Sequence, residues 1–427
     1  MKCFAFLMSL LCATSLQAAT FFAAPNGSAS NAGTELSPWD LQTALEHTSI
    51  LPGDTVMLRG GTYKHPNRAV SSKGYAVKLQ GSVAFPILVR PFHRERVVID
   101  GGLCSADSGW GNYYRLHGLE VIVSENLTQT RTTTNPGSDA PPDLLRPWGG
   151  IDIRKGLGVD VTHCFIHDCF QGIGHWKEAT GTVCGNVIKN NGWIGPDRKH
   201  GAGIYSQNLT GKTKRFANNL LIDNYEANAQ LYGSTAAPID NYEWCDNVHF
   251  KGPVTGSGRV LIGGDGASVN VEVSRNIGNW NLDVGYTGLN PSGFNLICRD
   301  NRILGDLSQK PNWQNVYKPQ GSNVWQILGF AKPRTEGFHG DRSGVDTDWP
   351  NLVTKACRSE FDPDLVHVSV LDPNVSETST VVALPFDGDY EVWNPLSDTR
   401  FNGTGATATL PLTGNLTIYV VRRVNCG

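Results

Sequence analysis

The 427-residue sequence is poor in charge and has no long apolar run beyond its N-terminus. Only 18% of its residues are charged, and the formal net charge is −3. Such a balance lacks the basic surface that binds nucleic acids or anionic membranes, so we expect neither partner. Helical periodicity is also weak, and no later stretch is long enough to cross a bilayer. The 48 glycines and 23 prolines favour a turn-rich all-β protein.

Zinc-site spacing of the CxxC type is missing as well, so a structural zinc is not expected. At the N-terminus Lys2 precedes the apolar run CFAFLMSLLCA, and Ala18 and Ala19 offer a cleavage site. This pattern predicts a signal peptide over residues 1–19 and a secreted protein, extracellular or periplasmic. An even number of cysteines then remains, which is compatible with disulfides of unreadable connectivity. They are Cys104, Cys164, Cys169, Cys184, Cys245, Cys298, Cys357 and Cys426.

Two ladders of residues recur through the middle of the chain. Successive members of either ladder lie 22 to 33 residues apart, and each member of the second follows its counterpart in the first by 13 to 17 residues. The apolar ladder is Ile151, Ile173, Ile204, Leu231, Ile262 and Val284. The polar ladder is Cys164, Asn186, Asn219, Asn247, Asn276 and Asn301. This period predicts a β-solenoid whose coils stack in register, with asparagines hydrogen-bonded along the stack.

Several short motifs place the chain near a known family. They are APNGSASNAGTELSPW, PGDTVMLRGGTY, VVIDGG and RLHGLEV at Arg115–Val121. With these the chain resembles the secreted right-handed parallel β-helix proteins of the pectate-lyase-like superfamily, over roughly residues 20 to 305. The resemblance implies the fold but not the reaction, because the superfamily includes lyases, hydrolases, epimerases and tail-spike proteins.

The expected organisation is a β-helix followed by a small β-rich appendage. After the signal peptide, residues 20–345 are predicted to form the right-handed parallel β-helix, with an amphipathic cap at PWDLQTAL over its open end. Residues 346–427 contain strands such as HVSVL and LTIYVVRR and predict an all-β appendage. Two interpretations of that appendage stay open: a lid on the last coil, or a carbohydrate-binding unit.

Side chains that alternate with the apolar ladder should share one outer face. The first outward column is Asp152, Gly174, Tyr205, Tyr232, Gly263 and Gly285. The second is Arg154, Trp176, Gln207, Ser234, Asp265 and Thr287. Aromatic, arginine and amide side chains on one face fit a sugar chain, since rings stack on sugars and polar groups bind hydroxyls or carboxylates. The alternative is a solvated sheet on which aromatic side chains support one another.

One turn is much longer than the others. Nine residues separate Cys164 from Ile173, but eighteen separate Asn186 from Ile204. Solenoids place their insertions around the binding face, so the extra segment is a candidate site. The alternative is an ordinary solvated basic loop. Its chemistry-bearing residues are Trp193, Asp197, Arg198, Lys199 and His200.

Spacing also separates hydrolysis from elimination. Glycoside hydrolysis normally needs two carboxyls about 5 to 9.5 Å apart. Asp152 and Asp265 lie four coils apart, about 19 Å at the spacing of parallel strands. These two cannot act as a pair, so a hydrolase would need loop acids such as Asp197 or Glu226.

Elimination from a uronate needs a base and a positive group beside the carboxylate. We expect Lys199 or His200 as the base, Arg198 or Arg154 as the neutralising group, and Tyr205 as the acid. The residues expected to hold substrate are Arg154, Trp176, Trp193, Gln207, Tyr232, Asp152, Asp265 and Arg259. Ca²⁺ is a possible cofactor, with Asp152 as a ligand, although no acidic cluster is visible.

The sequence therefore favours an enzyme that cleaves a uronate-containing polysaccharide by β-elimination. The alternatives are a glycoside hydrolase on the same fold and a non-catalytic polysaccharide-binding or adhesion protein. The polysaccharide and the oligomeric state cannot be read from the residues.

Overall fold

In the computed structural model, the described part of the chain begins at residue 18 and has internal gaps. It comprises residues 18–69, 73–105, 110–128, 130–137, 149–209, 211–251, 258–264, 268–286, 294–299, 301–303, 325–328, 353–358, 364–371, 378–414 and 416–424. The predicted signal peptide 1–19 therefore falls almost wholly outside it. None of the described helices is long and apolar enough to span a membrane.

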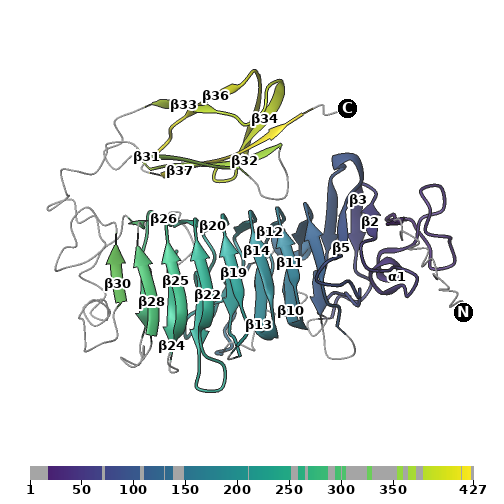
Figure 1. The fold of residues 1–427 in the computed structure, drawn as a ribbon, viewed down its shortest axis with the longest axis horizontal. Coiled ribbons are helices and arrows are strands. Elements are labelled where there is room, and N and C mark those ends of the chain that lie inside the picture. The colour runs from purple at the N-terminus through teal and green to yellow at the C-terminus, as the bar shows by residue number, and fades with distance from the viewer. Residues whose placement is uncertain are drawn as a thin grey trace, which may run out of the picture.

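Three parallel sheets run along the molecule, and the chain visits them in rotation (Figure 1). Sheet I consists of β4 (Tyr75–Ala76), β7 (Leu103–Ser105), β10 (Ile151–Gly156), β13 (Ile173–Ala179), β18 (Ala202–Ser206), β21 (Ala227–Gly233), β24 (Val260–Gly264) and β27 (Leu282–Tyr286). Sheet II consists of β1 (Thr20–Ala23), β2 (Thr55–Leu58), β5 (Ile87–Pro91), β8 (Tyr114–His117), β11 (Val159–Thr162), β14 (Gly181–Cys184), β19 (Lys214–Ala217), β22 (Asp240–Cys245), β25 (Val269–Ser274), β28 (Phe294–Arg299) and β30 (Trp325–Leu328). Sheet III consists of β3 (Gly61–Lys64), β6 (Val97–Asp100), β9 (Glu120–Ile122), β12 (Phe165–His167), β15 (Val187–Lys189), β20 (Leu220–Ile222), β23 (Val248–Phe250), β26 (Ile277–Gly278) and β29 (Arg302–Ile303). The predicted parallel β-helix is confirmed.

A short helix covers the N-terminal end of the core, as predicted. α1 (Leu41–Glu46) begins at Asp40, whose side chain accepts a hydrogen bond from the Thr43 backbone N at 2.9 Å. Leu41, Ala44 and Leu45 are buried against the first coils. Two 3₁₀ turns, at Phe92–Arg94 and Ser124–Leu127, complete the helical content of the described residues.

The apolar ladder lies inside the helix, but its register differs from the predicted one at a single step. Ile204 pairs with Ala229 rather than with Leu231, which pairs with Ser206. Beyond that step Leu231, Ile262 and Val284 are in line, as expected. Because a strand alternates every residue, a slip of two keeps the same face inward, and pattern alone cannot detect it.

The asparagine ladder is confirmed as a buried, hydrogen-bonded column. Asn219 Nδ2 donates to Asn247 Oδ1 at 2.9 Å, and Asn219 Oδ1 accepts from the backbone N and the Nδ2 of Asn186 at 3.1 and 2.9 Å. The same bonds continue to Asn276 and Asn301. This column fills the turn between sheets II and III.

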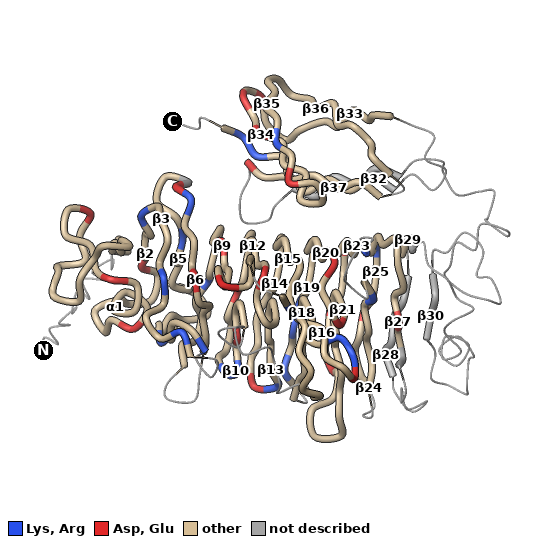
Figure 2. The backbone as a smooth tube through the Cα atoms, turned by 180° about the vertical axis from the view of Figure 1, so that it is seen from behind, with Lys and Arg blue, Asp and Glu red and all other residues tan. Residues whose placement is uncertain are grey.

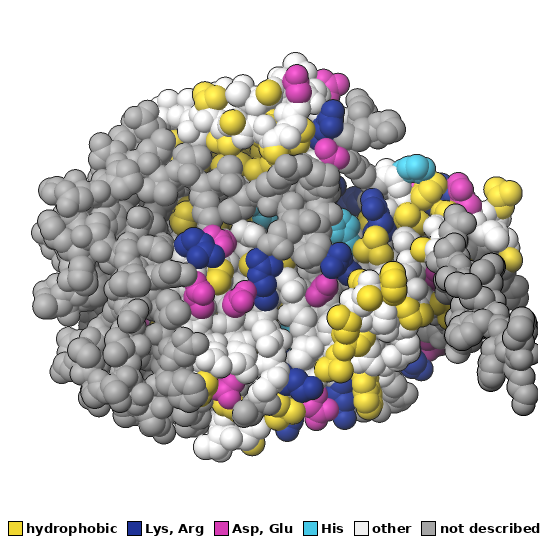
Figure 3. Space-filling model, in the orientation of Figure 1, with side chains coloured by type: hydrophobic (Ala, Val, Ile, Leu, Met, Phe, Trp, Pro, Cys, Tyr) yellow, Lys and Arg dark blue, Asp and Glu magenta, His cyan; other side chains and the backbone are white. Residues whose placement is uncertain are grey.

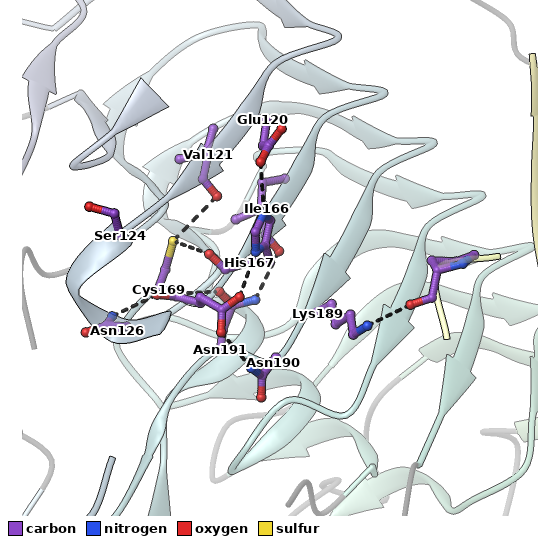
Figure 4. Close-up of polar contacts among 12 residues, drawn as sticks. Glu120, Val121, Ser124, Asn126, Ile166, His167, Cys169, Lys189, Asn190 and Asn191 are labelled. Carbon is purple, nitrogen blue, oxygen red and sulfur yellow. Dashed lines mark hydrogen bonds and ion pairs between the residues drawn. The ribbon is translucent and has the colours of Figure 1, made fainter. Parts of the chain in front are cut away.

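A second column of this kind lies between sheets III and I and was not predicted (Figure 4). Asn191 Oδ1 accepts from Cys169 N at 3.0 Å, and Asn191 Nδ2 donates to Asn224 Oδ1 at 2.9 Å. Asn224 Nδ2 in turn donates to Asn228 Oδ1 at 2.9 Å. A signal was available, because Cys169, Asn191 and Asn224 each follow a member of the first column by five residues.

Five cysteines that the sequence allowed in disulfides are free thiols. Each is buried, and the side chains of Cys298 and Cys357, like Cys426, lie outside the described part. Cys164 and Cys169 occupy the first rung of the two asparagine columns, where each thiol faces a backbone carbonyl. The free thiols are Cys104, Cys164, Cys169, Cys184 and Cys245.

The C-terminal region forms a small antiparallel sandwich with its own core. One layer consists of β31 (Val353–Arg358), β32 (Leu365–Leu371), β37 (Leu416–Arg423), β34 (Asp389–Asn394) and β35 (Thr399–Thr404). The other layer consists of β33 (Ser379–Ala383) and β36 (Thr407–Pro411). The domain limits at residues 345 and 346 stay predictions.

The sandwich lies along the outside of sheet III (Figures 1 and 2). Its side chains Leu365, Trp393 and Ile418 share an apolar cluster with Val187 and Leu220 of the β-helix. Polar contacts join the two parts as well, because Lys189 Nζ donates to Pro395 O at 2.8 Å (Figure 4). The described strands of the sandwich therefore cover a side of the helix and not the end of its last coil. Sheet I, on another side of the coil, stays clear of this contact.

Candidate functional site

The enlarged turn between Asn186 and Ile204 forms a hairpin. β16 (Trp193–Ile194) pairs antiparallel with β17 (Lys199–His200), and Trp193 lies opposite His200. The Trp193 ring packs between Phe170, at 4.0 Å between centroids, and His200, at 4.9 Å. Figure 2 shows the charged residues of this turn beside β16. The aromatic stack holds the hairpin against sheet I.

A cleft of about 260 Å³ lies between this hairpin and the outer face of sheet I. It brings together side chains from four successive coils and from the insertion. Those that matter for the chemistry are Asp152, Arg154, Trp176, Arg198, His200, Tyr205, Glu226 and Gln230. Seven of the predicted site residues therefore meet here: Asp152, Arg154, Trp176, Trp193, Arg198, His200 and Tyr205.

Asp152 anchors one side of the cleft. Its Oδ2 accepts from Arg154 Nε at 2.9 Å, and its Oδ1 accepts from Trp176 Nε1 at 2.5 Å. The Arg154 guanidinium also lies over the Trp176 ring, 5.4 Å from its centroid, which is within the roughly 6 Å over which a ring face attracts a cation. Both carboxylate oxygens are in use and the residue is buried. Asp152 thus holds Arg154 and Trp176 in place, and its expected contact with substrate stays a prediction.

Tyr205 forms the centre of the cleft. Its ring lies 5.1 Å from that of Trp176, and its hydroxyl accepts a hydrogen bond from Gln207 Nε2 at 3.1 Å. Burial raises the pKa of the Tyr205 phenol above its ordinary value, so the hydroxyl keeps its proton near neutral pH. A protonated phenol beside the Trp176 ring, in a cleft that arginines also line, can donate to an oxygen of a bound sugar.

The other side of the cleft carries the Arg198 group. Arg198 forms an ion pair with Glu226, and its Nε lies 3.9 Å from Asp197 Oδ2. Asp197 Oδ1 contacts His200 Nε2 at 3.0 Å. The hydrogen bond from His200 lowers the pKa of Asp197 to about 2, so this carboxylate is ionised in neutral solution. The carboxylate therefore fixes the histidine ring and leaves Nδ1 as the nitrogen able to accept a proton.

Two predicted roles disagree with burial. Trp193 is 1% exposed, because Phe170 and His200 cover its faces, so it cannot offer a surface to a sugar as expected. His200 is also 1% exposed and lies at the floor of the cleft. A substrate would reach its Nδ1 only after the hairpin shifts.

Among the described residues, four predicted site residues do not line the cleft: Lys199, Gln207, Tyr232 and Arg259. Lys199 neighbours His200 on β17, and adjacent strand residues point to opposite sides. Tyr232 pairs with Gly263, and it is Gln230 that pairs with Tyr205. The slip of two residues explains why Gln230 was missed. Asp265 lies outside the described residues, so its predicted role is left open.

The donor set of the cleft does not fit a protein-bound Ca²⁺. Calcium takes six to eight oxygens, several of them from carboxylates. In the described residues no three His, Cys, Asp or Glu side chains converge. The two carboxylates of the cleft, Asp152 and Glu226, are each committed to an arginine.

Outside the cleft, His163 and His167 pack in structural contacts. His167 Nδ1 contacts Asp168 Oδ2 at 2.7 Å and its Nε2 contacts Glu120 Oε1 at 3.3 Å (Figure 4). Burial would lower the pKa of His167, but these two hydrogen bonds raise it. His163 packs at the contact with the sandwich, 6.0 Å from the His367 ring.

The fold and the cleft together define a parallel β-helix protein with a polar, aromatic groove on one sheet. No family model matches the chain. The sequence is 35% identical over 373 residues to Pectate lyase L of Paenibacillus polymyxa (strain SC2), covering 81% of this chain and 76% of that protein. The chain therefore belongs to the pectate lyase-like family of parallel β-helix proteins.

Solved structures with detectable similarity include two lyases. Pectate lyase Pel9A has a TM-score of 0.48 at 16% identity, over 73% of this chain and 76% of that one. The alginate lyase from Paenibacillus sp. str. FPU-7 has a TM-score of 0.37 at 12% identity, over 73% and 98%.

Proposed function

We propose that this protein is a secreted polysaccharide lyase that cleaves a uronate-containing polysaccharide by β-elimination in the cleft on sheet I. The observation that carries the proposal is the meeting of Arg154, Arg198 and Tyr205 in one cleft, in a chain of the pectate lyase-like family. The secreted location rests on the apolar run that follows Lys2 and on the small residues at Ala18 and Ala19.

Each step of the elimination has a candidate group. Arg154 and Arg198 neutralise the uronate carboxylate, which acidifies the proton on the adjacent carbon. After the hairpin has shifted to expose it, His200 Nδ1 takes that proton, since its Nε2 is held by Asp197. The C–O bond on the next carbon breaks as the new carbon–carbon double bond forms, and Tyr205 protonates the departing oxygen.

Carbohydrate contacts come from the remaining lining. Trp176 and Tyr205 offer ring faces for stacking, and Gln171 and Gln230 offer amides for hydroxyl groups. Glu226 keeps the Arg198 guanidinium at the rim through their ion pair. The cleft thus combines apolar faces with a few directed polar groups, the usual composition of a sugar site.

A hydrolase remains the rival within this fold. Asp152 on β10 and Glu226 beside β21 are three strand steps apart, about 14 Å at 4.8 Å per step. This exceeds the separation that either hydrolytic mechanism uses. Glu226 and Asp197 are closer, since both approach Arg198, but Asp197 is already held by His200.

The test is a product assay on purified protein. Polygalacturonate and alginate would be compared with a neutral polysaccharide, following the ultraviolet absorbance of the unsaturated uronate and the number of new reducing ends. We expect both signals from one of the uronates. Reducing ends without absorbance would overturn the lyase and favour the hydrolase, and binding without either signal would favour an adhesin.

Matched variants locate the reaction. Arg154→Gln and Tyr205→Phe should each lower kcat/KM by roughly a hundredfold. Arg275→Gln serves as the control, because Arg275 pairs with Asp246 at the outer surface of sheet II. Equal activity in all three variants would place the active site elsewhere.

A further inference from the structure

Lys214 is a lysine sealed in the core directly behind the cleft. It begins β19 of sheet II and is 0% exposed. In the same inward column the preceding coil has Gly181 and the following coil has Tyr242. The long Lys214 side chain crosses the core toward sheet I, where its Nζ reaches the backbone of β13.

The ammonium is held by three backbone carbonyls. Nζ donates to His175 O at 2.9 Å, to Trp176 O at 2.5 Å and to Gln207 O at 2.6 Å. These bonds use all three N–H groups of a protonated lysine. Burial lowers the pKa of Lys214 well below its ordinary value. A charge so far from water persists in proteins only where such bonds compensate for lost hydration.

Those carbonyls are available because strand pairing stops beneath the cleft. β13 and β18 pair from Ile173–Ile204 to His175–Ser206, and no further. On its other side β13 pairs with β10, and the register shifts there: Ile153 pairs with His175, but Lys155 pairs with Glu178. β13 therefore has a bulge just after His175. Gln207 N still donates to His175 O at 3.4 Å, but Trp176 and Gln207 both lie outside the registered pairs, and Lys214 supplies donors to their carbonyls from inside.

The outward side chain of Trp176 lines the cleft, and that of Gln207 contacts a residue that lines it. Trp176 lines it and donates to Asp152, while Gln207 donates to the Tyr205 hydroxyl. Ser206, between Tyr205 and Gln207 in the sequence, turns inward. Its hydroxyl lies 2.8 Å from both His175 O and the Tyr242 hydroxyl. The cleft floor is therefore a single layer of backbone with substrate groups outside and Lys214 inside.

We propose that Lys214 is a positioning residue for the cleft. From the core it fixes the backbone at Trp176 and Gln207, and thereby the relative placement of the Trp176 ring and the Tyr205 hydroxyl. The kinetic part of this inference rests on the proposed lyase function, whereas the placement of Trp176 does not.

The decisive variant is Lys214→Met, which keeps length and loses the three donors. Lys212→Met is the matched control, since Lys212 is a partly exposed lysine two residues earlier. Lys214→Gln retains two N–H donors on a shorter side chain. All assays run well below the unfolding temperature of each variant, with circular dichroism as the check of the fold.

The first readout is the quenching of Trp176 fluorescence by iodide. The Trp176 signal is obtained by subtracting the fluorescence of the same protein carrying Trp176→Phe. We expect Lys214→Met to change the Trp176 quenching constant at least about twofold and Lys212→Met to leave it unchanged, because only the former releases the backbone. This readout needs no turnover. It can therefore succeed even if no polysaccharide is cleaved, so the two proposals fail separately.

The second readout is kinetic. Lys214→Met should lower kcat/KM by roughly ten- to a hundredfold, the scale expected when reacting groups are misplaced by about 1 Å. In a protein that already carries Trp176→Phe, Lys214→Met should lower kcat/KM much less, since Lys214 acts by positioning Trp176. Unchanged quenching and unchanged kcat/KM in folded Lys214→Met would overturn the inference. If neither Lys214 variant folds, the lysine is required for the fold and the positioning role is rejected.

Discussion

The inner asparagines of the first column, Asn219, Asn247 and Asn276, each serve four hydrogen-bonding groups with one amide. Asn219 donates to Val183 O and Asn247 Oδ1, both at 2.9 Å, and accepts from the backbone and side chain of Asn186. A turn between two sheets exposes backbone groups that no ladder satisfies. The amide fills that need without bringing charge into the core.

Replacing Asn219 by Ala should therefore destabilise the protein strongly. Four buried polar groups lose their partner at once, and a single unsatisfied group costs about 1 to 3 kcal/mol. We expect a loss of at least about 3 kcal/mol in the free energy of unfolding, measured by urea denaturation. Asn402→Ala, at an exposed position of β35, should change it by less than about 0.5 kcal/mol. Equal effects would show that the column contributes little.

At the proposed active site the two predicted bases can be separated. His200 lines the cleft with Nε2 held by Asp197, whereas Lys199 points away from it. We expect His200→Ala to reduce kcat by roughly a hundredfold or more. Lys199→Ala should retain most activity on the same polysaccharide. The opposite pattern would assign the base to Lys199 and would require the hairpin to turn over on binding substrate.

At the scale of elements, the enlarged turn was predictable and the register was not. Counting residues between ladder members located the insertion that became β16 and β17. The same counting aligned Leu231 with Ile204, although the strands pair Ala229 there. Ala229 and Leu231 both face inward, so hydrophobicity could not choose between them, and Tyr232 was placed in the site instead of Gln230.

Burial of individual side chains was equally beyond the pattern. Trp193 and His200 lie in a polar insertion, where exposure is the usual expectation. Their rings instead stack on each other and on Phe170, a contact between segments that no periodicity connects. Lys214 is the clearest example, since a lysine at a strand start gives no sign that its ammonium ends among core carbonyls.

The contact between sandwich and β-helix should be sensitive to acid. A hollow lies there, with histidine side chains visible at its edge (Figure 3). His163 is packed by His117 on β8, His367 on β32 and Arg422 on β37, with Asp364 also lining the hollow. Burial lowers the pKa of His367 to about 4 and that of His163 well below its ordinary value.

Because these folded pKa values lie below the ordinary 6.5, the unfolded chain takes up protons first as the pH falls. The neutral, buried His367 contributes on the order of 3 kcal/mol to the free energy of unfolding. This contribution is complete above pH 6.5 and is lost progressively as the pH falls toward about 4. We expect the unfolding temperature to fall over this range, and His367→Gln to flatten the dependence. His93→Gln, at an exposed histidine, is the control. An unchanged slope in His367→Gln would contradict the assignment.

For the molecule as a whole, the interior thiols report on the integrity of the stack. The five described cysteines are free and at most 5% exposed, and burial raises the pKa of Cys164 to about 12. A maleimide reagent should leave all five unmodified in the native protein and label all five in urea without any reductant. Peptide mass spectrometry identifies the sites. A disulfide-linked peptide containing any of them would contradict the structure.

The sandwich and the cleft occupy different sides of the coil. Apolar residues of sheet III are covered by the sandwich, and the groups proposed for catalysis project from sheet I. Acid-induced loosening of the sandwich should therefore lower stability before it alters the cleft directly. Comparing the pH profiles of unfolding and of kcat/KM in wild type and His367→Gln separates the two effects.

The asparagine columns also limit how such a protein changes its length. Successive members of the first column, from Cys164 to Asn301, are 22, 33, 28, 29 and 25 residues apart, so the loops of a coil vary while the side-chain contact to the next coil does not. A deletion or duplication of one full coil, from one asparagine to the next, brings two asparagines of the column into contact. The column therefore stays in register. A change of a few residues inside a strand would offset both columns at once. Evolution and engineering alike are thus led to shorten or lengthen this scaffold in whole turns.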